Sequence, residues 1–486
     1  MLDNLILGFN YCFSASSLLY ILIGSIIGTI IGVLPGIGPL TTITILLPIT
    51  FTMPAAQAIM MLGAIYYGAQ YGGSTSAILM KIPGELSSMI TCIDGYKLSE
   101  KGDSGKALFV AAFGSFLAGV FATVLIGLIS KPITDLSLMF TSMSYVSFIF
   151  VGLIVSTLII DQPIVKSLIA LIFGILMSTI GIDGNDGSQR FVFGVSTLFD
   201  GIGIVVLVTG MFGLVEVIKY LKPDYAKIYP VGSFRLDKSE YRRIMPSIGR
   251  GTLIGSVIGM IPGGGALISS MLAYSTEKFI NPKLGTGVLE GVAAPEAANN
   301  AGAQTSFIPM LTLGIPENPV VAVMIAALMI HGVQIGPTLL TTHSELFWGF
   351  VVSMLVGNAM LLILNLPLIK IWINLVSVDP KYVYTASLLF SIVGALSLSS
   401  DISDVMLIQL FFVIGFLFHL AKIDVTPAMM GFALGPLLEE KIFQSVVITH
   451  GSWGTFFADV PATLFLVALA IVIIVKSRVF KRAIHV

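Results

Sequence analysis

The chain has 486 residues, of which 56% are hydrophobic and 10% charged, and its formal net charge is −1. Soluble globular proteins carry about 25% charged residues, and a mean hydropathy of +0.98 is too apolar for a cytoplasmic enzyme. The long, uninterrupted apolar runs predict an all-α polytopic integral membrane protein. They exclude a soluble enzyme, a nucleic-acid-binding protein, a disulfide-built secreted module and an outer-membrane barrel.

The first predicted element is a membrane span close to the N-terminus. Between Asp3 and Lys81 the chain has no Asp, Glu, Lys or Arg. It opens without a basic segment followed by a small-residue cleavage site, so we expect residues 1–34 to be a retained span and not a signal peptide. The sequence LPGIGP at 34–39 cannot continue a regular helix, because proline lacks a backbone N–H and clashes with the preceding turn.

Further apolar runs lie between a first polar loop and a basic linker. They cover residues 107–130, 136–160, 164–182 and 197–218, close to the roughly 17–25 residues that a spanning helix needs. Four lysines mark the loop, eight Lys and Arg occupy residues 219–250, and four more lie at 476–482. Excess Lys and Arg indicate the cytoplasmic side of a membrane, so we expect the linker and the C-terminus to be cytoplasmic.

The second half of the chain repeats the first. Residues 28–42 read GTIIGVLPGIGPLTT and residues 255–269 read GSVIGMIPGGGALIS, with seven of fifteen positions identical. A second motif follows in each half and ends in Ile-Pro, at 82–83 and at 315–316. The sequence predicts about 10–12 transmembrane helices. They would form an N-terminal membrane repeat at 1–218, a cytoplasmic basic linker at 219–250 and a C-terminal membrane repeat at 251–486.

Opposite charge bias in equivalent loops favours inverted repeats. The loop at 81–106 carries four lysines, whereas its counterpart at 317–345 has no Lys or Arg and contains Glu317 and Glu345. The positive-inside rule would place these two loops on opposite sides of the membrane. Farther along, the charges at 439–441 are interpreted as a solvated turn.

The repeated Pro-Gly breaks predict a transport site. Discontinuous helices at matching positions of two repeats indicate a binding site near the midplane of a transporter. The exposed N–H groups of half-helix N-termini attract anions, and the freed carbonyls suit Na⁺. Small polar residues flank both breaks: Thr41, Thr42, Gln70, Ser74, Thr75 and Ser76 in the first half, and Ser269, Ser270, Asn299, Asn300, Gln304, Thr305 and Ser306 in the second.

Purely structural explanations compete with this interpretation. In each half three glycines follow an i, i+4, i+8 pattern, which is more typical of close helix packing than of binding; they are Gly24, Gly28 and Gly32, and Gly251, Gly255 and Gly259. A single Pro-Gly break is as often a plain kink as a site. Lys81 and Glu85, four residues apart, could simply pair. The occurrence of the break in both halves favours a solute or ion site.

Six motifs carry a resemblance that covers nearly the whole chain. They are GVLPGIGPLTTI (32–43), IYYGAQYGGSTSAILMKIPGE (65–85), DGY (94–96), EGVAAPEAANNAGAQ (290–304), PMLTLGIPEN (309–318) and IHGVQIGP (330–337). On these motifs the chain resembles the large membrane subunit of the tripartite tricarboxylate transporters, the TctA family.

The resemblance implies a secondary active transporter subunit in the bacterial inner membrane. Such a subunit would import a small organic acid, citrate or a related carboxylate, by symport with a cation, usually Na⁺. The implied partners are a small membrane subunit, a periplasmic solute-binding protein, the carboxylate and the lipid bilayer, with no nucleic acid. No cofactor is implied beyond the coupling ion, and the oligomeric state stays open.

The resemblance also implies the residues of a substrate and ion site. These are Pro35, Gly36, Gly38, Thr41, Thr42, Gly72, Gly73, Ser74, Ser76, Pro83, Gly84, Pro262, Gly263, Gly264, Gly265, Asn299, Asn300 and Pro316. Na⁺ would bind through backbone carbonyls near the helix breaks, and no catalytic residue or other metal is implied.

The chain departs from the family pattern at the tips of the two hairpins. The family more often has Asn where this chain has Lys81, and a glycine and a small residue where it has Glu317 and Asn318, whereas Glu85 follows the pattern. A carboxylate beside a tricarboxylate site repels the substrate by several kcal/mol at low effective dielectric, unless it is paired or protonated. We therefore hypothesise that these four residues set specificity and that the chain carries a less negative carboxylate.

Two other functions remain as alternatives. The first is a stand-alone transporter or exporter of the same fold that needs no binding protein. The second, more remote, is an intramembrane enzyme such as a protease. That chemistry requires paired Asp residues, a Ser/His pair or HExxH within the spans, and the five scattered histidines and two isolated cysteines offer no such set. We therefore expect the protein not to be an enzyme.

Overall fold

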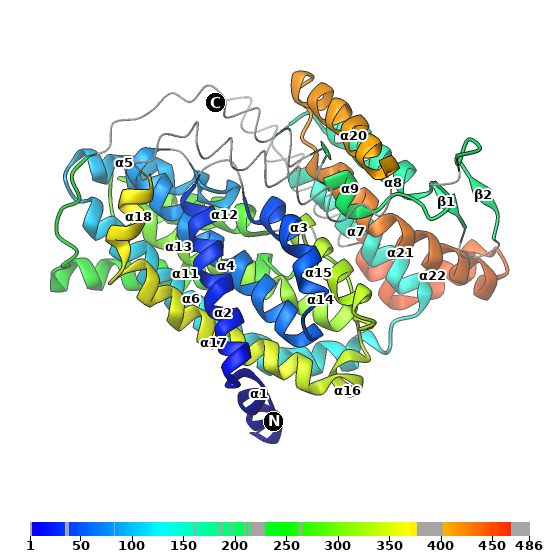
Figure 1. The fold of residues 1–486 in the computed structure, drawn as a ribbon, viewed down its shortest axis with the longest axis horizontal. Helices are drawn as coiled ribbons and strands as arrows, with labels where there is room; N and C mark the ends of the chain where they lie inside the picture. Colours follow the sequence, from blue (N-terminus) through cyan, green and yellow to red (C-terminus); the bar gives the residue numbers. More distant parts are fainter. Residues whose placement is uncertain are drawn as a thin grey trace. The chain divides into compact units, whose positions relative to one another are not determined.

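The computed structural model describes residues 2–34, 38–81, 83–159, 162–183, 187–195, 198–208, 210–211, 215, 229–261, 265–376 and 402–467. These residues are predominantly helical, which confirms the predicted all-α class (Figure 1). The helices of the first half are α1 (Leu2–Cys12), α2 (Ala15–Val33), α3 (Gly38–Thr50), α4 (Ala55–Met80), the 3₁₀ helix η1 (Leu86–Met89), α5 (Thr91–Glu100), α6 (Ser104–Ser137), α7 (Ser142–Ile159), α8 (Ile164–Ser178) and α9 (Ile204–Val208). Strands β1 (Gly181–Ile182) and β2 (Gln189–Arg190) form one short antiparallel hairpin.

The helices of the second half follow a similar succession of long and short segments. They are α11 (Lys238–Ile258), α12 (Gly265–Ile280), α13 (Glu290–Thr305), α14 (Phe307–Leu313), α15 (Pro319–Ile330), α16 (Leu339–Thr342), α17 (Ser344–Asn365), α18 (Ile369–Val376), α20 (Ile402–Leu420), α21 (Thr426–Thr449) and α22 (Trp453–Ala458). Helix α11 begins inside the range expected to be a linker, because Asp237 and Glu240 form a capping box at its N-terminus.

Three of the described helices, α2, α6 and α17, are long and apolar enough to cross a bilayer. Shorter apolar helices lie at Gly38–Thr50, Ser142–Val155, Ile164–Ser178, Pro319–Ile330 and Val405–Leu420. The shortness of α3 has a local cause, since it starts directly after the Pro-Gly sequence that interrupts the chain. The number of about 10–12 spanning helices stays a prediction.

The chain forms two compact units, and each takes segments from both halves of the sequence. Unit 1 comprises residues Met1–Thr134 and Ile204–Leu420, and unit 2 comprises Asp135–Gly203 and Ala421–Val486. The spatial division therefore differs from the linear division into repeats that the sequence suggests. All described residues of the candidate site belong to unit 1.

Two helix pairs in unit 1 pack through glycines, α2 on α4 and α11 on α13 (Figure 1). A Cβ atom added to Gly24 or Gly28 would lie 2.5 Å from the carbonyl oxygen of Met61 or Ile65. The glycines of α11 approach the carbonyls of α13 in the same way, Gly255 opposite Ala298. The packing interpretation of the glycine patterns is thus confirmed, because only glycine lets the backbones come so close.

The two helix pairs run in opposite directions. Within each pair the contacts advance together along both helices, so α2 and α4 are parallel, as are α11 and α13. Between the pairs the order reverses. Tyr66 of α4 packs on Phe307, with ring centroids 5.9 Å apart, whereas Ser74, two turns later, contacts the earlier residue Glu296.

A buried carboxylate holds the two halves together near the start of α13. Asp94 of α5 accepts hydrogen bonds from the backbone N–H groups of Gly285, Gly287 and Val288 and from the hydroxyl of Tyr274. Two lysines add contacts to this loop. Lys97 of α5 donates from Nζ to the carbonyl of Gly285, and Lys101, the residue after α5, donates from Nζ to the carbonyl of Gly287.

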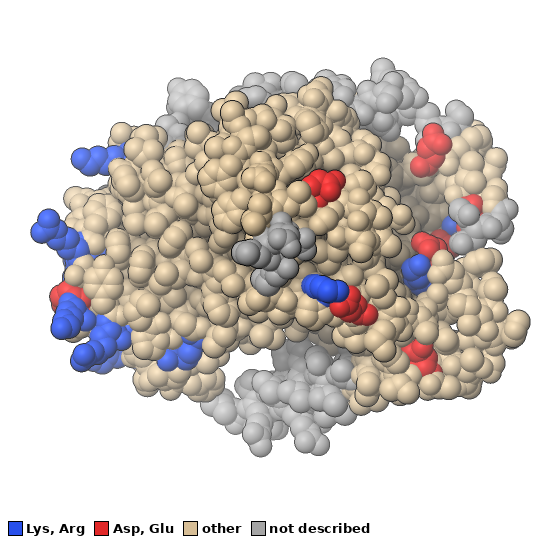
Figure 2. Space-filling model, turned by 90° about the horizontal axis from the view of Figure 1, so that it is seen from below, with Lys and Arg blue, Asp and Glu red and all other residues tan. Residues whose placement is uncertain are grey.

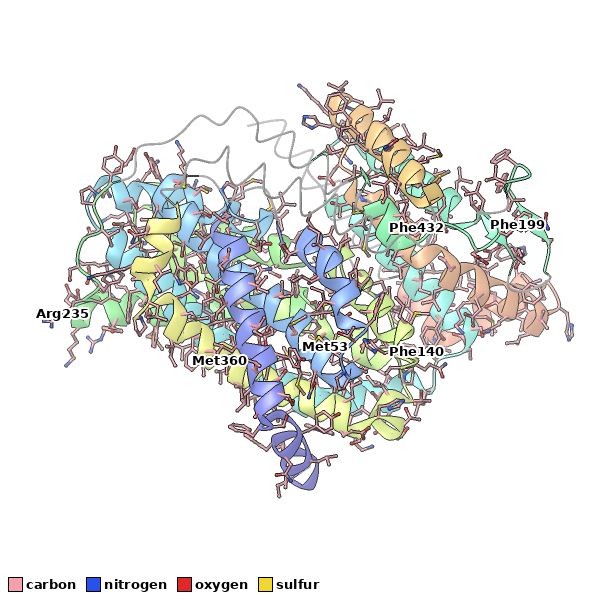
Figure 3. The ribbon with its side chains drawn as sticks, in the orientation of Figure 1. Met53, Phe140, Phe199, Arg235, Met360 and Phe432 are labelled. Carbon is pink, nitrogen blue, oxygen red and sulfur yellow. The ribbon has the colours of Figure 1, made fainter. Side chains whose placement is uncertain are left out.

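Basic side chains gather at one edge of the molecule. Figure 2 shows Lys and Arg side chains together at its left edge, the side on which Figure 3 labels Arg235. The first polar loop and the start of α11 meet here, since Lys106 Nζ lies 2.8 Å from Glu240 Oε1 and the rings of Tyr96 and Tyr229 are 6.0 Å apart. The first polar loop and the start of the basic segment at α11 therefore lie at one end of unit 1.

Unit 2 packs α21 against α7 and α8. Gly431 of α21 lies against the carbonyl of Leu171 in α8, again without room for a side chain. The interpretation of residues 439–441 as a solvated turn is wrong, because these residues lie within α21 and Glu439 pairs with Arg190 of β2. Glu439 therefore forms an ion pair with a residue distant in the sequence, whereas its neighbours in the sequence had indicated a solvated position.

Candidate functional site

A polar stripe on α4 faces the interior of unit 1. Tyr66, Gln70 and Ser74 follow one another at intervals of four residues, which places them on one helix face, and all three are buried. Tyr66 Oη accepts a hydrogen bond of 3.0 Å from Asn318, and Gln70 Oε1 accepts one of 2.7 Å from Ser87. The stripe thus joins the hairpin tips of both halves along a single helix.

Glu296 of α13 lies at the end of this stripe. Its side chain is 0% exposed. Ser74 Oγ donates a hydrogen bond of 2.9 Å to Oε2, and Thr91 Oγ1 donates one to Oε1. Glu296 is not among the residues predicted from the sequence. The available signal is an acid within the otherwise small, uncharged run GVAAPEAANN, since intramembrane acids mark functional positions.

Two predicted amides follow Glu296 on the same helix. Asn300 donates from Nδ2 to Ser115 Oγ, at 2.6 Å, and to the carbonyl of Glu296. Asn299 is 0% exposed, and its amide approaches the Glu296 carboxylate without a well-aligned hydrogen bond. Asn299 is thus the predicted residue whose polar atoms are left most available.

Both helices that follow the breaks start at a glycine with a left-handed backbone. The φ angle is +64° at Gly38, the first residue of α3, and +55° at Gly265, the first residue of α12. Thr42 Oγ1 donates to the carbonyl of Gly38, at 2.9 Å, and the buried Thr41 hydroxyl has no partner among the described residues. Five predicted residues lie outside the described residues, namely Pro35, Gly36, Pro262, Gly263 and Gly264.

The amino ends of α3 and α12 differ in what faces them. An added Cβ at Gly38 would meet no atom of the described residues within 4 Å. At Gly265 the Oε1 atom of Glu317 lies 3.2 Å from the Cβ position. Glu317 is 0% exposed, and Asn318 Nδ2 donates to its Oε2 atom. A carboxylate of the protein therefore already lies at the amino end of α12.

Several predicted residues have a packing role. An added Cβ on Gly72 would meet Thr29 and Val33 of α2, and one on Gly84 would clash with the carbonyl of Gly32. Gly73 lies against Ser88 Oγ and Glu85 Cγ. The remaining three are less informative: Ser76 is buried and donates to the carbonyl of Gly73, Pro316 is buried, and Pro83 is partly buried.

Lys81 and Glu85 do not pair with each other. Lys81 is exposed, and its Nζ atom lies 5.7 Å from the ring centroid of Tyr96. Glu85 is only partly exposed and accepts a hydrogen bond of 3.1 Å from the backbone N–H of Ser87, as the N-cap of η1. Of these two hairpin-tip charges, Glu85 faces the polar interior and Lys81 faces outward.

Comparisons with known proteins agree with this architecture. Residues 18–430 match the family described as "Tripartite tricarboxylate transporter TctA family". The chain belongs to the TctA family. A protein of Agrobacterium vitis named "Uncharacterized 52.8 kDa protein in TAR-I ttuC' 3'region" is 41% identical over 481 residues, which is 98% of this chain and 96% of that protein.

A second protein of the same organism, named "Uncharacterized protein in TAR-II ttuC' 3'region", is 40% identical over 226 residues. The match covers 46% of this chain and 93% of that protein. No solved structure matches the chain. The resemblance seen in the motifs is therefore confirmed, and this TctA-family protein is a membrane transporter subunit.

Proposed function

We propose that this TctA-family subunit imports a small organic acid across the bacterial inner membrane by symport with Na⁺. A periplasmic solute-binding protein would deliver the acid, and a small membrane subunit would complete the transporter. The observation that carries the proposal is that α3 and α12 each start at a left-handed glycine directly after a Pro-Gly sequence, in a unit that also holds the buried polar stripe of α4. Half-helix N-termini at such a place suit the carboxylate groups of a substrate.

The antiparallel order of α4 and α13 supports inverted repeats at 1–218 and 251–486, joined by the basic linker at 219–250. Inverted repeats suit alternating access, because exchanging the conformations of the two halves moves the opening from one side of the membrane to the other. Both native cysteines, Cys12 and Cys92, are buried, which makes cysteine labelling informative. Lys238→Cys should react with an impermeant thiol reagent only from the cytoplasm, and Gln334→Cys only from the periplasm.

Uptake by purified protein in proteoliposomes tests the function. We expect uptake of a carboxylic acid to require an inward Na⁺ gradient and to increase when the binding protein is added. Uptake at the same rate without a binding protein would favour a stand-alone transporter. Replacing Asn299 or Asn300 by Ala should abolish coupling, and wild-type rates in both variants would contradict the placement of the site.

Glu317 supports a substrate with fewer charges than a tricarboxylate. Two unit charges 4 Å apart repel by about 4 kcal/mol at an effective dielectric constant of 20. An ionised Glu317 at the amino end of α12 would therefore oppose a substrate carboxylate there, whereas an added Cβ at Gly38, at the start of α3, would meet no described atom within 4 Å. We propose that the subunit prefers a mono- or dicarboxylate, with one carboxylate at α3.

A further inference from the structure

Two buried acids of unit 1, Glu277 and Glu290, are paired with arginines, whereas the described residues give neither Glu296 nor Glu317 a cationic partner. Glu277 Oε1 lies 2.8 Å from Arg250 Nη2, and Glu290 Oε1 lies 3.7 Å from Arg243 Nη1. Among the described residues, no Lys, Arg or His lies within 4 Å of the Glu296 carboxylate, whose two hydrogen bonds come from neutral hydroxyls. A buried, ionised carboxylate without a counter-charge is very costly, so neutralisation is required.

A side-chain amide with unsatisfied polar atoms lies beside this carboxylate. Asn299, one helical turn from Glu296, is fully buried, and neither its Oδ1 nor its Nδ2 atom has a well-aligned hydrogen-bond partner among the described residues. Most buried polar atoms in proteins are hydrogen-bonded, and those that are not indicate a missing ion or water. The unpartnered Oδ1 oxygen of Asn299, next to a carboxylate that no cation balances, points to a bound cation.

The available atoms match the chemistry of a small, hard cation. Carboxylate, hydroxyl and amide oxygens are the ligands that such cations prefer, and they come here from α4, α5 and α13 in Ser74, Thr91, Glu296 and Asn299. The other titratable groups whose charge would act on Glu296 are Glu85, Tyr71 and Cys92. None of these three can supply a positive charge.

We propose that Glu296, together with Ser74, Thr91 and Asn299, binds the monovalent cation that moves with the substrate. This inference rests on the proposed transport function and assigns its coupling site to side chains instead of to the carbonyls at the helix breaks. Because Glu296 lies in the second half and Ser74 and Thr91 in the first, cation binding stabilises the arrangement in which the halves are in contact. The cation and the acid thereby become energetically coupled.

The Glu296→Gln variant tests the proposal, since it keeps the size of the side chain and removes the charge. In proteoliposomes, uptake by the wild type and by the variant is measured with a Na⁺ gradient and, in a second experiment, with a pH gradient. We expect the variant to lose at least about tenfold in gradient-driven uptake, which corresponds to 1.4 kcal/mol, while exchange of internal for external substrate continues. Glu290→Gln, a buried and ion-paired acid on the same helix, is the matched control and should keep the wild-type cation dependence.

A binding measurement separates this proposal from the transport function itself. A ligand that binds only the folded protein raises its melting temperature. The melting temperature of the purified wild type should therefore rise with NaCl relative to choline chloride, or with proton concentration, and Glu296→Gln should lose that rise. If no acid in the panel is transported but this rise depends on Glu296, the proposed function fails and the cation site stands.

Equal cation dependence of wild type and Glu296→Gln in both assays would overturn the proposal. If Glu296→Gln does not fold, the Asn299→Ala variant tests the proposal, because it keeps the charge of Glu296 and removes one proposed ligand of the cation. It should abolish coupling to the cation gradient, and a cation dependence equal to that of the wild type would overturn the proposal as well.

Discussion

Replacing Asp94 by Ala should remove a fully hydrogen-bonded connection between the two sequence halves. Asp94 is 0% exposed and accepts hydrogen bonds from four donors, namely Tyr274 Oη at 2.8 Å and the N–H groups of Gly285, Gly287 and Val288 at 2.8, 2.6 and 3.1 Å. A hydrogen bond to a charged group contributes about 1.5–3 kcal/mol, and partial access of water to the freed donors reduces the loss to about 1 kcal/mol each. We therefore expect a loss of about 4 kcal/mol in the free energy of unfolding.

The assay is reversible unfolding in mixed detergent micelles, with helix content as the readout. Glu100→Ala is the matched control, since Glu100 is exposed at the end of the same helix, α5, and its removal should change the free energy of unfolding by less than about 0.5 kcal/mol. If Asp94→Ala lost no more than Glu100→Ala, the four hydrogen bonds would not hold the halves together and the reasoning would be refuted.

Three further predictions concern packing, specificity and pH. Gly28→Ala places a methyl group 2.5 Å from the carbonyl of Ile65 and should lower the free energy of unfolding by about 1–3 kcal/mol. In the control, Gly249→Ala, no described atom lies within 4 Å of the new methyl group, so the free energy of unfolding should stay unchanged or rise by up to about 1 kcal/mol. The same unfolding titration measures both variants. Glu317→Gly should raise the rate of citrate uptake relative to dicarboxylates, measured in proteoliposomes; citrate as the best wild-type substrate, with no change in the variant, would contradict the role of Glu317. Hydrogen bonds from Ser239 and from the N–H of Glu240 lower the pKa of Asp237 from its usual 3.8, so the stabilisation of the first turn of α11 is fully present above that value and is lost as the pH falls through the lowered pKa. Hydrogen exchange should show the amides of Ser239 and Glu240 losing protection over that acid range, and equal profiles for wild type and Asp237→Asn would disprove the effect.

Periodicity and glycine spacing predicted much of unit 1. The i, i+4, i+8 glycines follow directly from the need of two helices to approach closely in a membrane, so a close-packing face on α2 was predictable from the sequence, whereas its partner α4 was not. The starts of α3 and α12 were also predictable, because Pro-Gly sequences end one helix and a left-handed glycine begins the next.

The centre of the site was not predictable in the same way. Glu296 receives its partners from Ser74 and Thr91, which lie more than 200 residues earlier in the chain. No local pattern encodes such contacts, since they depend on the antiparallel placement of α4 against α13. The role of Glu439 was missed for the same reason, because its partner, Arg190, comes from a distant hairpin.

The interleaving of the two units has a consequence for biosynthesis. Helices α7 and α8 of unit 2 pack against α21. The first segment of unit 2 ends at Gly203, and α21 is synthesised roughly 220 residues later. At translation rates of about 5–20 residues per second, the interval is on the order of 10–45 s. During that time the apolar faces of α7 and α8 must be held by lipid or by the insertion machinery. Nascent chains that stop before α21 should therefore be the preferred targets of membrane quality-control proteases.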